Sequence, residues 1–533
     1  MVSLLIGKTI VINNKEYMIL SPNNGDKNCI SLYNCSSKRF LRHYASKVIE
    51  TDDELNASRY SYDSSFVAEI GNNVIYLKVS NPGFINRYVY KDGDVFKITA
   101  KDVDPKELKY GFTVIGFDAS ESESIDTLLY DELKEKCSNL EKKYACEVAA
   151  TKLRNISGNI KKKKRIVFIG TGKLGENAQY AFIHLNTLIK INGMNDVESL
   201  YFARNKIEKE YFDSLNLPCE IWSSKNYSHI LYALQAKVAV FSTHTFANSE
   251  SNSALLACLF GAYRIQLWHG FLAKMVGCAT LKNGYSLWRM ANMLEDCAVD
   301  VVTTALNSKE VVEKYEICFP GADVICTGDA RADALFQSAK NEKVDKWCAA
   351  NKDKIKLLFS PTYRESSAAA LAYIKSFIDV CSKIDRKQAA IAIKFHPVFF
   401  SKLPNDRDKV IKEIEDIGVL FISEREDSYT IMNKFDAMAT DYSSVRLDFA
   451  STGKPIILFR PDYSQYTAVR KINPMAEFDM LDSVSYDMEK DDIIEAINSD
   501  AKRNDRLEVV EKIGLYTDGK NAERVCSIIL SKV

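Results

Sequence analysis

The chain has 533 residues, of which 46% are hydrophobic and 27% are charged. Lysine and arginine together number 71, and so do aspartate and glutamate, so the formal net charge is zero. This balance removes any chain-wide electrostatic case for nucleic-acid binding, and the length predicts about three domains rather than one. The 13 cysteines include no C-x-x-C pair, which predicts reduced thiols in a cytoplasmic protein.

Residues 1–120 are predicted to form a small all-β module. The evidence is a set of short apolar runs separated by Asn-Gly, Asp-Gly and Pro-Gly turns, at 9–20, 72–79, 87–100 and 110–117. The first apolar stretch is too short and too interrupted to predict a signal peptide. No window reaches the ~18–20 apolar residues that a membrane-spanning helix needs, so we expect any membrane association to be peripheral.

A helical linker is predicted at 121–164. Apolar residues recur at helical spacing over 126–155 among charges of both signs. The basic run KKKKR, Lys161–Arg165, then marks a boundary. Such a run is either a solvated linker or a contact for anionic lipid head groups.

From residue 165 onwards, short apolar runs alternate with helical stretches. Eleven runs read as strands: RIVFIG, SLYFAR, KVAVFST, YRIQLWHG, VDVVTTA, DVICTG, KIKLLFSP, AAIAIKFHP, GVLFIS, DAMATD and KPIILFRPD. Alternation sustained for this long predicts parallel sheets in an α/β architecture. So many strands fit two doubly wound lobes better than one sheet, and we place these lobes at 165–325 and 326–533.

The first of these strands leads into a glycine loop. Gly170, Gly172 and Gly175 form G-x-G-x-x-G before a helix-like segment, a pattern typical of anion sites at helix N-termini. For NAD, an acidic residue is expected after the second strand, but that strand ends in Arg204, which would suit the 2′-phosphate of NADP. Three interpretations remain: a dinucleotide site, a turn at the cleft between the lobes, or close packing alone.

Polar residues follow several other strands directly. The segments are IQLWHGFLAKMVG at 265–277, TGDARADAL at 327–335, SPTYRE at 360–365, KFHPVFF at 394–400 and ATDYSSVRLDFASTGKPIILFRPDYSQY at 439–466. In open α/β sheets, the crevice beyond the strands' carboxyl ends is where ligands bind. The chemistry is therefore predicted to lie in these segments.

These segments resemble the CDP-glycerol:poly(glycerophosphate) glycerophosphotransferase family of teichoic-acid primases and polymerases. The family pattern runs QxWHGTxLK, GxPRxD, PTxR, HP, TDYSSxxFD and GKPIxxY. The matching residues, in order, are Gln266, Trp268, His269, Gly270 and Lys274; Gly328 and Asp333; Pro361, Thr362 and Arg364; His396 and Pro397; Asp441, Tyr442, Ser443, Ser444 and Asp448; and Gly453, Lys454 and Pro455. Asn177 matches the family's Asn-containing helix start, and the resemblance covers about 165–466.

The chain also departs from the family pattern. Phe271 replaces the threonine after WHG, and Ala330-Arg331 replaces the Pro-Arg pair. The first 120 residues match nothing in that family. These departures leave the transferred group and the acceptor open.

The resemblance implies a GT-B-like fold, in which two Rossmann-like lobes face each other across the active site. It places the acceptor on the N-terminal lobe and the nucleotide donor on the C-terminal lobe. The implied reaction transfers glycerol or ribitol phosphate from a CDP-activated donor to a hydroxyl of a lipid-linked or polymer acceptor, with CMP leaving. Its setting would be synthesis of a teichoic-acid-like wall or capsule polymer.

The resemblance also implies roles for single residues. His269 would be the general base, since an imidazole titrates near neutral pH, and His396 would donate to the diphosphate and stabilise the leaving CMP. The residues expected to bind the donor or its phosphates are Thr362, Arg364, Asp441, Ser443, Ser444, Gly270 and Lys274. Each also has a structural alternative, such as a helix cap, an ion pair or a core position.

The expected partners are the CDP-polyol donor and the acceptor. Family members work on lipid-linked acceptors at the inner face of the membrane, which implies a cytoplasmic protein with a peripheral membrane contact. No cluster of His, Cys or carboxylates has the spacing of a metal site, so we expect neither a metal nor a separate cofactor. Nucleic acid is not expected, and homo-oligomerisation remains open.

Three alternatives compete with this hypothesis. A GT-B glycosyltransferase or a sugar-nucleotide epimerase would keep the fold, and TGDARADAL is similar to a segment of UDP-sugar epimerases. A polymer-binding protein without activity would have no use for both His269 and His396. An NADP-dependent oxidoreductase would depend on the glycine loop alone.

Overall fold

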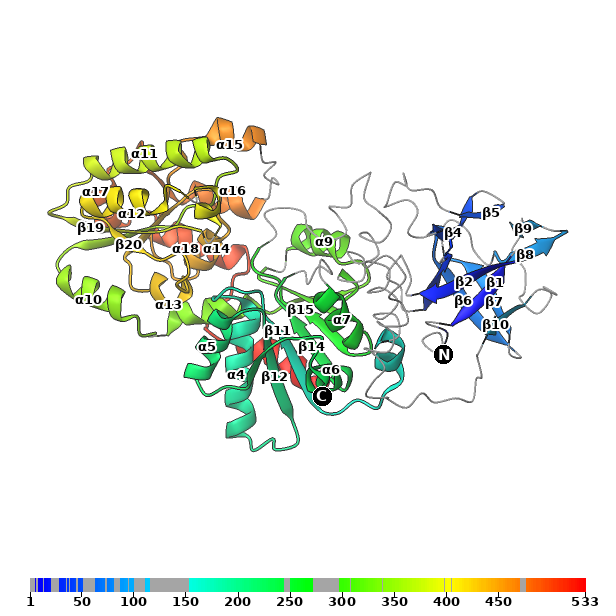
Figure 1. Cartoon of the computed structure of the whole chain (residues 1–533). Coiled ribbons are helices and arrows are strands. Elements are labelled where there is room, and N and C mark those ends of the chain that lie inside the picture. The colour runs from blue at the N-terminus through cyan, green and yellow to red at the C-terminus, as the bar shows by residue number, and fades with distance from the viewer. Residues whose placement is uncertain are drawn as a thin grey trace.

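The structure is a computed structural model of the chain. It describes residues 5, 8–12, 14–20, 28–34, 36–37, 39–44, 47–50, 63–71, 74–80, 87–93, 95–99, 111–115, 153–243, 250–271, 297–306, 308–337, 339–396, 398–403, 405–469 and 476–533. Figure 1 shows an all-β region at one end of the molecule and two α/β regions at its centre and other end. Most of the predicted linker, 121–152, lies outside the described residues, whereas 153–159 is helical.

The N-terminal region is a ten-stranded antiparallel sheet in the order β2-β1-β10-β7-β6-β3-β4-β5-β9-β8. Its strands are β1 (Thr9–Ile12), β2 (Lys15–Leu20), β3 (Cys29–Asn34), β4 (Arg39–Tyr44), β5 (Lys47–Glu50), β6 (Phe66–Gly71), β7 (Val74–Val79), β8 (Val89–Asp92), β9 (Val95–Ile98) and β10 (Phe112–Ile115). Because β2 also pairs with β3, strands β1, β2, β3, β6, β7 and β10 close into a ring. The predicted all-β character is confirmed.

The ring is held by the alternation of its strands. In β7, Ile75, Leu77 and Val79 are buried while the residues between them are partly exposed. Successive strand side chains point to opposite faces, so one face of each strand supplies the apolar interior. This alternation is the residue pattern expected of strands that bury one face.

The second sheet has seven parallel strands in the order β13-β12-β11-β14-β15-β16-β17. Its strands are β11 (Arg165–Ile169), β12 (Glu198–Ala203), β13 (Cys219–Ile221), β14 (Val238–Phe241), β15 (Tyr263–Gln266), β16 (Val301–Thr304) and β17 (Asp323–Cys326). The helices along this stretch are α4 (Asn177–Ile191), α5 (Lys206–Ser214), α6 (Tyr227–Leu234), α7 (Glu250–Cys258) and α9 (Lys309–Cys318).

The third sheet has six parallel strands in the order β20-β19-β18-β21-β22-β23. Its strands are β18 (Ile355–Phe359), β19 (Ala389–Lys394), β20 (Leu420–Ile422), β21 (Ala437–Thr440), β22 (Ile456–Leu458) and β23 (Tyr486–Asp487). The helices along the chain from residue 330 are η4 (Ala330–Phe336), α10 (Glu342–Ala350), α11 (Ser367–Lys383), η5 (Phe399–Lys402), α12 (Arg407–Asp416), α13 (Tyr429–Met432), α14 (Val445–Ala450), α15 (Tyr463–Val469), α16 (Ala476–Ser483), α17 (Ile493–Ser499), α18 (Arg503–Lys512) and α19 (Asn521–Ser531).

Both parallel sheets are covered by helices on their two faces. In β18, Leu357 and Phe359 pack into one apolar cluster while Leu358 packs into another on the opposite face. In β11, Val167 and Phe168 are divided in the same way. Strands buried on both faces have continuous apolar sequences, which is why these runs can be recognised without alternation.

All eleven strands predicted after residue 165 are confirmed. Two further strands were missed, β13 and β23, which have three and two residues. Runs this short carry too few apolar residues to stand out from the loops around them. In each parallel sheet the first strand along the chain, β11 or β18, lies inside the sheet, with the strand order reversing beside it. Such reversal points are where open α/β sheets bind ligands.

The C-terminal helix crosses back from the third sheet to the second. Cys526 of α19 contacts the carbonyl of Ala181 in α4 at 3.3 Å. The carboxylate of Asp333 accepts hydrogen bonds from the backbone amides of Asn521 and Ala522, which begin α19. The predicted lobe boundary at residue 326 would assign α19 to the C-terminal lobe, whereas in the structure α19 packs against α4 of the second-sheet region.

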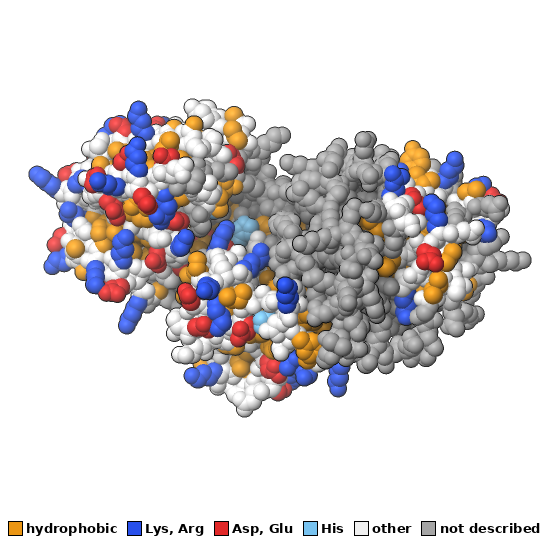
Figure 2. Space-filling view, in the orientation of Figure 1, with side chains coloured by type: hydrophobic (Ala, Val, Ile, Leu, Met, Phe, Trp, Pro, Cys, Tyr) orange, Lys and Arg blue, Asp and Glu red, His pale blue; other side chains and the backbone are white. Residues whose placement is uncertain are grey.

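The surface of the two α/β regions is mixed in charge. Figure 2 shows acidic and basic side chains interspersed on this face of both regions, in keeping with the zero net charge. Among the residues that the structure describes, no helix is both long enough and apolar enough to cross a membrane.

Candidate active site

A cavity of about 470 Å³ opens between the second and third sheets. Its walls come from the glycine loop after β11, the turn after β15, and the loops after β18, β19 and β21. Five of the predicted site residues line it: His269, Thr362, His396, Ser443 and Ser444. The structure thus brings together the two histidines, one from each sheet, with the predicted hydroxyl groups.

The turn after β15 presents His269 to the cavity. Trp268 has a positive φ of 53° and Gly270 one of 131°, so the chain reverses sharply around the histidine. The Trp268 side chain is buried, its backbone amide donates to Oε1 of Gln266, and its ring lies 4.3 Å from the exposed His269 ring. Strained backbone of this kind is held only where surrounding contacts enforce it, and it clusters at functional sites.

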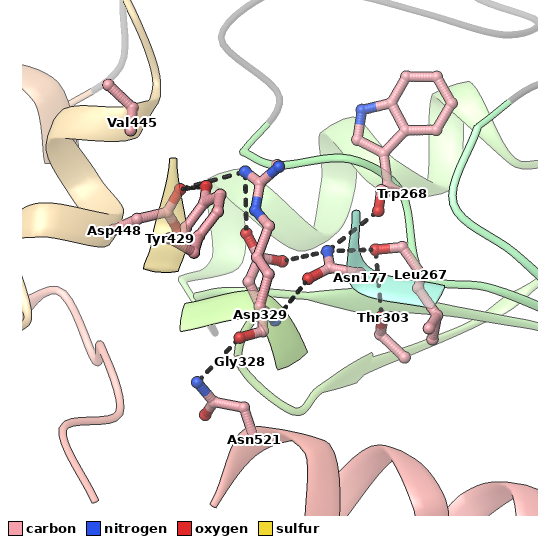
Figure 3. Close-up of polar contacts among 12 residues, drawn as sticks. Asn177, Leu267, Trp268, Thr303, Gly328, Asp329, Tyr429, Val445, Asp448 and Asn521 are labelled. Atoms are coloured by element: carbon pink, nitrogen blue, oxygen red, sulfur yellow. Dashed lines mark hydrogen bonds and ion pairs between the residues drawn. The ribbon is translucent and has the colours of Figure 1, made fainter. Parts of the chain in front are cut away.

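Asn177 fixes this turn from the start of α4. Its side-chain amide donates to the carbonyls of Trp268 at 3.0 Å and Leu267 at 3.3 Å, and to Asp329 Oδ1 at 3.0 Å, as Figure 3 shows. One buried amide therefore joins the loop after β11, the WHG turn and the segment after β17. Asn177, which matches the family's sequence pattern, therefore has a structural role: it fixes the WHG turn.

Gly270 lets Arg331 approach the turn. A Cβ atom at Gly270 would lie 2.6 Å from Arg331 Nη2 and 3.4 Å from Ser444 Oγ. The guanidinium of Arg331 lines the cavity, pairs with Asp448 at 3.1 Å and lies over the Tyr429 ring at 4.7 Å. Gly270 therefore contributes space and backbone freedom rather than a binding group.

Replacement of Gly270 by alanine is expected to displace Arg331 and to strain the turn. We expect a loss of about 1–3 kcal/mol in the free energy of unfolding and at least ~10-fold in any turnover that takes place in this cavity. Gly193→Ala is the matched control, because Gly193 also has a positive φ, 60°, but has nothing within 4 Å of a Cβ. Urea unfolding and a turnover assay measure the two effects. Equal effects of the two substitutions would contradict this role of Gly270.

His396 reaches the cavity from the loop after β19. Its Nδ1 accepts a hydrogen bond from the backbone amide of Val398 at 3.1 Å. That bond places the proton of the neutral ring on Nε2, the nitrogen that can then donate. The ring lies 5.1 Å from the ring of Tyr363, which also lines the cavity.

The serine pair lies at the turn between β21 and α14. Ser444 is the N-cap residue of α14, yet its side chain makes no capping hydrogen bond. Ser443 Oγ accepts only a long bond, 3.4 Å, from the amide of Val445. Both side chains are partly exposed and line the cavity, so capping does not account for them.

A sequence model of the CDP-Glycerol:Poly(glycerophosphate) glycerophosphotransferase family matches residues 151–531. The chain belongs to this family. The resemblance read from the motifs is thereby confirmed, and the family match begins after the N-terminal all-β region.

Curated relatives match over shorter stretches. The chain is 24% identical over 225 residues to the teichoic acid ribitol-phosphate polymerase TarK of Staphylococcus aureus, covering 38% of this chain and 40% of that protein. It is 29% identical over 178 residues to the teichoic acid poly(ribitol-phosphate) polymerase of Bacillus spizizenii, covering 32% of this chain and 28% of that protein. The matches thus span well under half the length of these relatives.

Among solved structures, the wall teichoic acid polymerase TagF is similar in fold. One TagF structure superposes with a TM-score of 0.53 at 15% identity, covering 77% of this chain and 98% of that chain. At this identity the likeness concerns the fold, and it supports the mixed α/β architecture found here.

Arg364 and Asp441, which were expected to bind the donor phosphates, do not line the cavity. Arg364 is buried, and its guanidinium contacts Asp441 Oδ2 at 2.8 Å, Asp462 Oδ2 at 2.5 Å and the carbonyl of Thr362 at 2.7 Å. Asp441 also accepts a hydrogen bond from the amide of Thr362 at 2.9 Å. The expectation that Arg364 and Asp441 bind phosphate does not fit this placement, since both are occupied with each other. They instead fix the loops after β18 and β21.

The neighbouring carboxylates keep the buried Arg364 side chain charged. Burial by itself would lower the pKa of Arg364, but the neighbouring Asp441 and Asp462 raise it above its usual value. Lys274, the remaining predicted phosphate ligand, lies outside the described residues.

Charged residues that the motif comparison did not select line the cavity instead. They are Lys173, Glu176, Arg331, Lys394 and Glu426. Burial lowers the pKa of Lys394 to about 8, although Asp427 and Glu426 act to raise it. Arg331 was visible in the sequence only as part of the departure from the family's Pro-Arg pair, and Lys394 is the last residue of β19, two residues before His396. The sequence indicated a cavity-lining position for Arg331 and Lys394 only through their closeness to motif residues.

The glycine loop binds a carboxylate of the chain itself. Glu208 in α5 accepts hydrogen bonds from the amides of Thr171 at 2.9 Å and Arg204 at 2.8 Å. A Cβ at Gly170 would lie 2.5 Å from Glu208 Oε2. Loop amides that would hold a pyrophosphate thus already bind an anion, which argues against a dinucleotide site.

The end of the same loop contacts the third-sheet region. A Cβ at Gly175 would lie 2.7 Å from Asp427 Oδ1, and Tyr180 of α4 donates to Asp427 Oδ2 at 2.6 Å. Burial raises the pKa of Asp427, and the Tyr180 hydrogen bond acts in the other direction. Of the three interpretations of the glycines, a turn at the cleft between the sheets agrees with these contacts.

The basic run before β11 is largely engaged within the protein. Lys162 Nζ donates to the carbonyl of Leu234 at 2.7 Å, and burial lowers the pKa of Lys162 to about 8. Lys164 pairs with Asp196 at 2.6 Å and Arg165 with Glu198 at 2.8 Å. These contacts favour a structural boundary over a lipid-binding patch.

Proposed function

We propose that the protein transfers a polyol phosphate from a CDP-activated donor to a hydroxyl group of a polymer or lipid-linked acceptor, in synthesis of a teichoic-acid-like polymer. Membership of the glycerophosphotransferase family supports the reaction class. The observation that carries the proposal is the convergence of His269 and His396, from two different sheets, on one cavity. The description of the family supports glycerol phosphate as the transferred group, and the names of the curated relatives support ribitol phosphate.

The proposed architecture is a GT-B pair of Rossmann-like lobes. The proposed divisions are a β module at 1–120, a linker at 121–164, an acceptor lobe at 165–325 and a donor lobe from 326, with α19 returning to the acceptor lobe. The 3-2-1-4-5-6 order of the first six strands in the second sheet supports a Rossmann-like lobe there. Contacts such as Tyr180 to Asp427 would then form where the lobes meet.

In the proposed mechanism, the hydroxyl oxygen of the acceptor attacks the polyol-bearing phosphorus. His269 accepts the hydroxyl proton, a new O–P bond forms, and the bond from phosphorus to the oxygen of CMP breaks. His269 suits this task because it is exposed to the cavity and held by a strained turn. Positioning of the attacking and leaving oxygens in line supplies much of the acceleration.

The donor phosphates would bind on the opposite wall. The hydroxyls of Ser443 and Ser444, left unused by helix capping, face the same cavity as His396. His396 would donate from Nε2 to an oxygen of the leaving CMP, and the cations Lys394 and Arg331 would balance the diphosphate charge. Thr362 lines this wall as well, where its backbone is fixed by Asp441.

We further propose that the acceptor brings the enzyme to the inner face of the cell membrane. The contact would be peripheral and would come through the acceptor rather than through residues 161–165, where Lys164 and Arg165 pair with carboxylates and Lys162 is bonded to a backbone carbonyl. No nucleic acid takes part in this reaction. The N-terminal β module is free in this scheme to contact polymer or a second copy of the chain.

The decisive experiment offers the protein a panel of activated donors. CDP-glycerol, CDP-ribitol, UDP-N-acetylglucosamine and NADPH are each incubated with it, with and without a teichoic-acid primer, and nucleotide release is measured. We expect CMP release from a CDP-polyol and stimulation by the primer. Turnover of the UDP-sugar alone would overturn the proposal in favour of a glycosyltransferase or epimerase.

A further inference from the structure

Glu176 lies in the cavity wall that the second-sheet region forms, and its carboxyl group does not cap the helix that it begins. Glu176 is the N-cap residue of α4, yet its side chain makes no capping hydrogen bond. Nearby amides are bound by other side chains: Gly175 N donates to Gln179 Oε1 at 2.8 Å and Ala178 N to Ser242 Oγ at 2.6 Å. The Glu176 side chain lines the cavity instead.

The Glu176 carboxyl is also unsatisfied. Its Oε2 atom is buried and has no hydrogen-bond partner among the described residues. Burying a carboxylate oxygen without a partner is unfavourable, so such groups call for a ligand or a functional reason. Because Glu176 lines the cavity, a ligand bound there could donate the hydrogen bond that Oε2 lacks.

The charges around Glu176 leave it able to ionise near neutral pH. Burial raises the pKa of Glu176 to about 7. Arg331 and Lys173 act to lower it, and Glu208 and Asp427 act to raise it further. A change of charge on this wall of the cavity therefore falls within the working range of most enzymes.

We propose that the carboxylate of Glu176 binds a hydroxyl group of the polyol acceptor, next to the hydroxyl that attacks. This deepens the proposed function and rests on it. A polyol carries hydroxyls on adjacent carbons, so the site must hold one in place for another to react. An ionised carboxylate accepts hydrogen bonds on both oxygens and binds hydroxyls more strongly than a neutral group does. Glu176 and His269 come from the same sheet, which gives one wall a group to orient the acceptor and a group to deprotonate it.

The proposal separates two reactions of the same donor. In transfer, the acceptor hydroxyl attacks and must be oriented. In hydrolysis, water attacks, its oxygen bonds to phosphorus, His269 takes the proton and CMP leaves. Hydrolysis needs the donor wall and His269 but no second hydroxyl. Loss of Glu176 is therefore expected to impair transfer and to spare hydrolysis.

The test is Glu176→Gln, with Glu210→Gln on the exposed face of α5 as the matched control. The acceptor KM, and CMP release with and without primer, are measured between pH 5.5 and 8.5. We expect the acceptor KM to rise about 10–100-fold, the range of a charge-assisted hydrogen bond, while CMP release without primer stays within about 2-fold. Glu176→Asp keeps the charge and is expected to lie between the parent and Glu176→Gln.

The pH dependence gives a second readout that a purely structural role would not move. The ionised form binds the acceptor, so the KM of the parent is expected to fall as pH rises through about 7, and that of Glu176→Gln to stay flat through this range. An equal loss of CMP release with and without primer would overturn the inference alone, and so would an unchanged KM. Absence of CMP release from every CDP-polyol by the parent protein would overturn the proposed function and the inference with it.

Discussion

Substitution of His269 by alanine is expected to lower transfer turnover by about 10²–10⁴-fold, the range that a positioned general base contributes. The side chain is exposed to the cavity and its ring contacts the ring of Trp268, so the substitution is expected to leave the stability of the protein nearly unchanged. Turnover is measured as CMP release in the presence of primer, and stability by urea unfolding of the same preparation.

Two controls make the His269 result specific. His229→Ala removes an imidazole of the second-sheet region that does not line the cavity and stacks on Trp222 instead. It is expected to retain turnover. Imidazole added to the His269→Ala variant is expected to restore part of the lost rate, because it can accept the proton in place of the side chain. Turnover of His269→Ala within a few-fold of the parent would show that another group is the base.

The strands of both α/β sheets could be predicted because their sequences carry the signal locally. Most are runs of apolar residues buried on both faces, as in β11, where Val167 and Phe168 pack into different apolar clusters. Sheet order, by contrast, is set by contacts between residues far apart in sequence. The return of α19 to the second sheet depends on Asp333 binding the amides of residues 521 and 522, a pairing that no local pattern encodes.

The placement of a site residue in the cavity could be predicted where a suitable residue type follows a strand end directly. It could not be predicted where a buried ion pair decides the position of the side chain. His396, Ser443 and Ser444 lie in the cavity as expected. Arg364 has the chemistry of a phosphate ligand, but Asp441 and Asp462 surround it. Whether an arginine meets a ligand or an internal carboxylate depends on its spatial neighbours, which are 77 and 98 residues away along the chain.

Substitution of Arg364 by methionine is expected to lower the free energy of unfolding by about 3–5 kcal/mol, because it leaves a buried carboxylate without its partner. The Asp441 side chain is fully buried and the Arg364 side chain is 1% exposed. Methionine keeps much of the apolar packing against the ring of Tyr373, which lies 4.2 Å from the guanidinium carbon. Denaturant unfolding measures the loss. Activity is expected to fall as well, because the Thr362 loop loses its anchor.

The double variant Arg364→Met/Asp441→Asn distinguishes an internal ion pair from a phosphate contact. If the pair is structural, removing both charges costs less than the sum of the two single losses, since no unpaired charge remains buried. Arg503→Met is the matched control, because Arg503 is 58% exposed and 3.9 Å from Asp500, and it is expected to change stability by less than about 0.5 kcal/mol. The opposite result would be an Arg364 variant that keeps full stability but loses affinity for the CDP-polyol donor. That result would show that Arg364 binds phosphate, as its motif suggests.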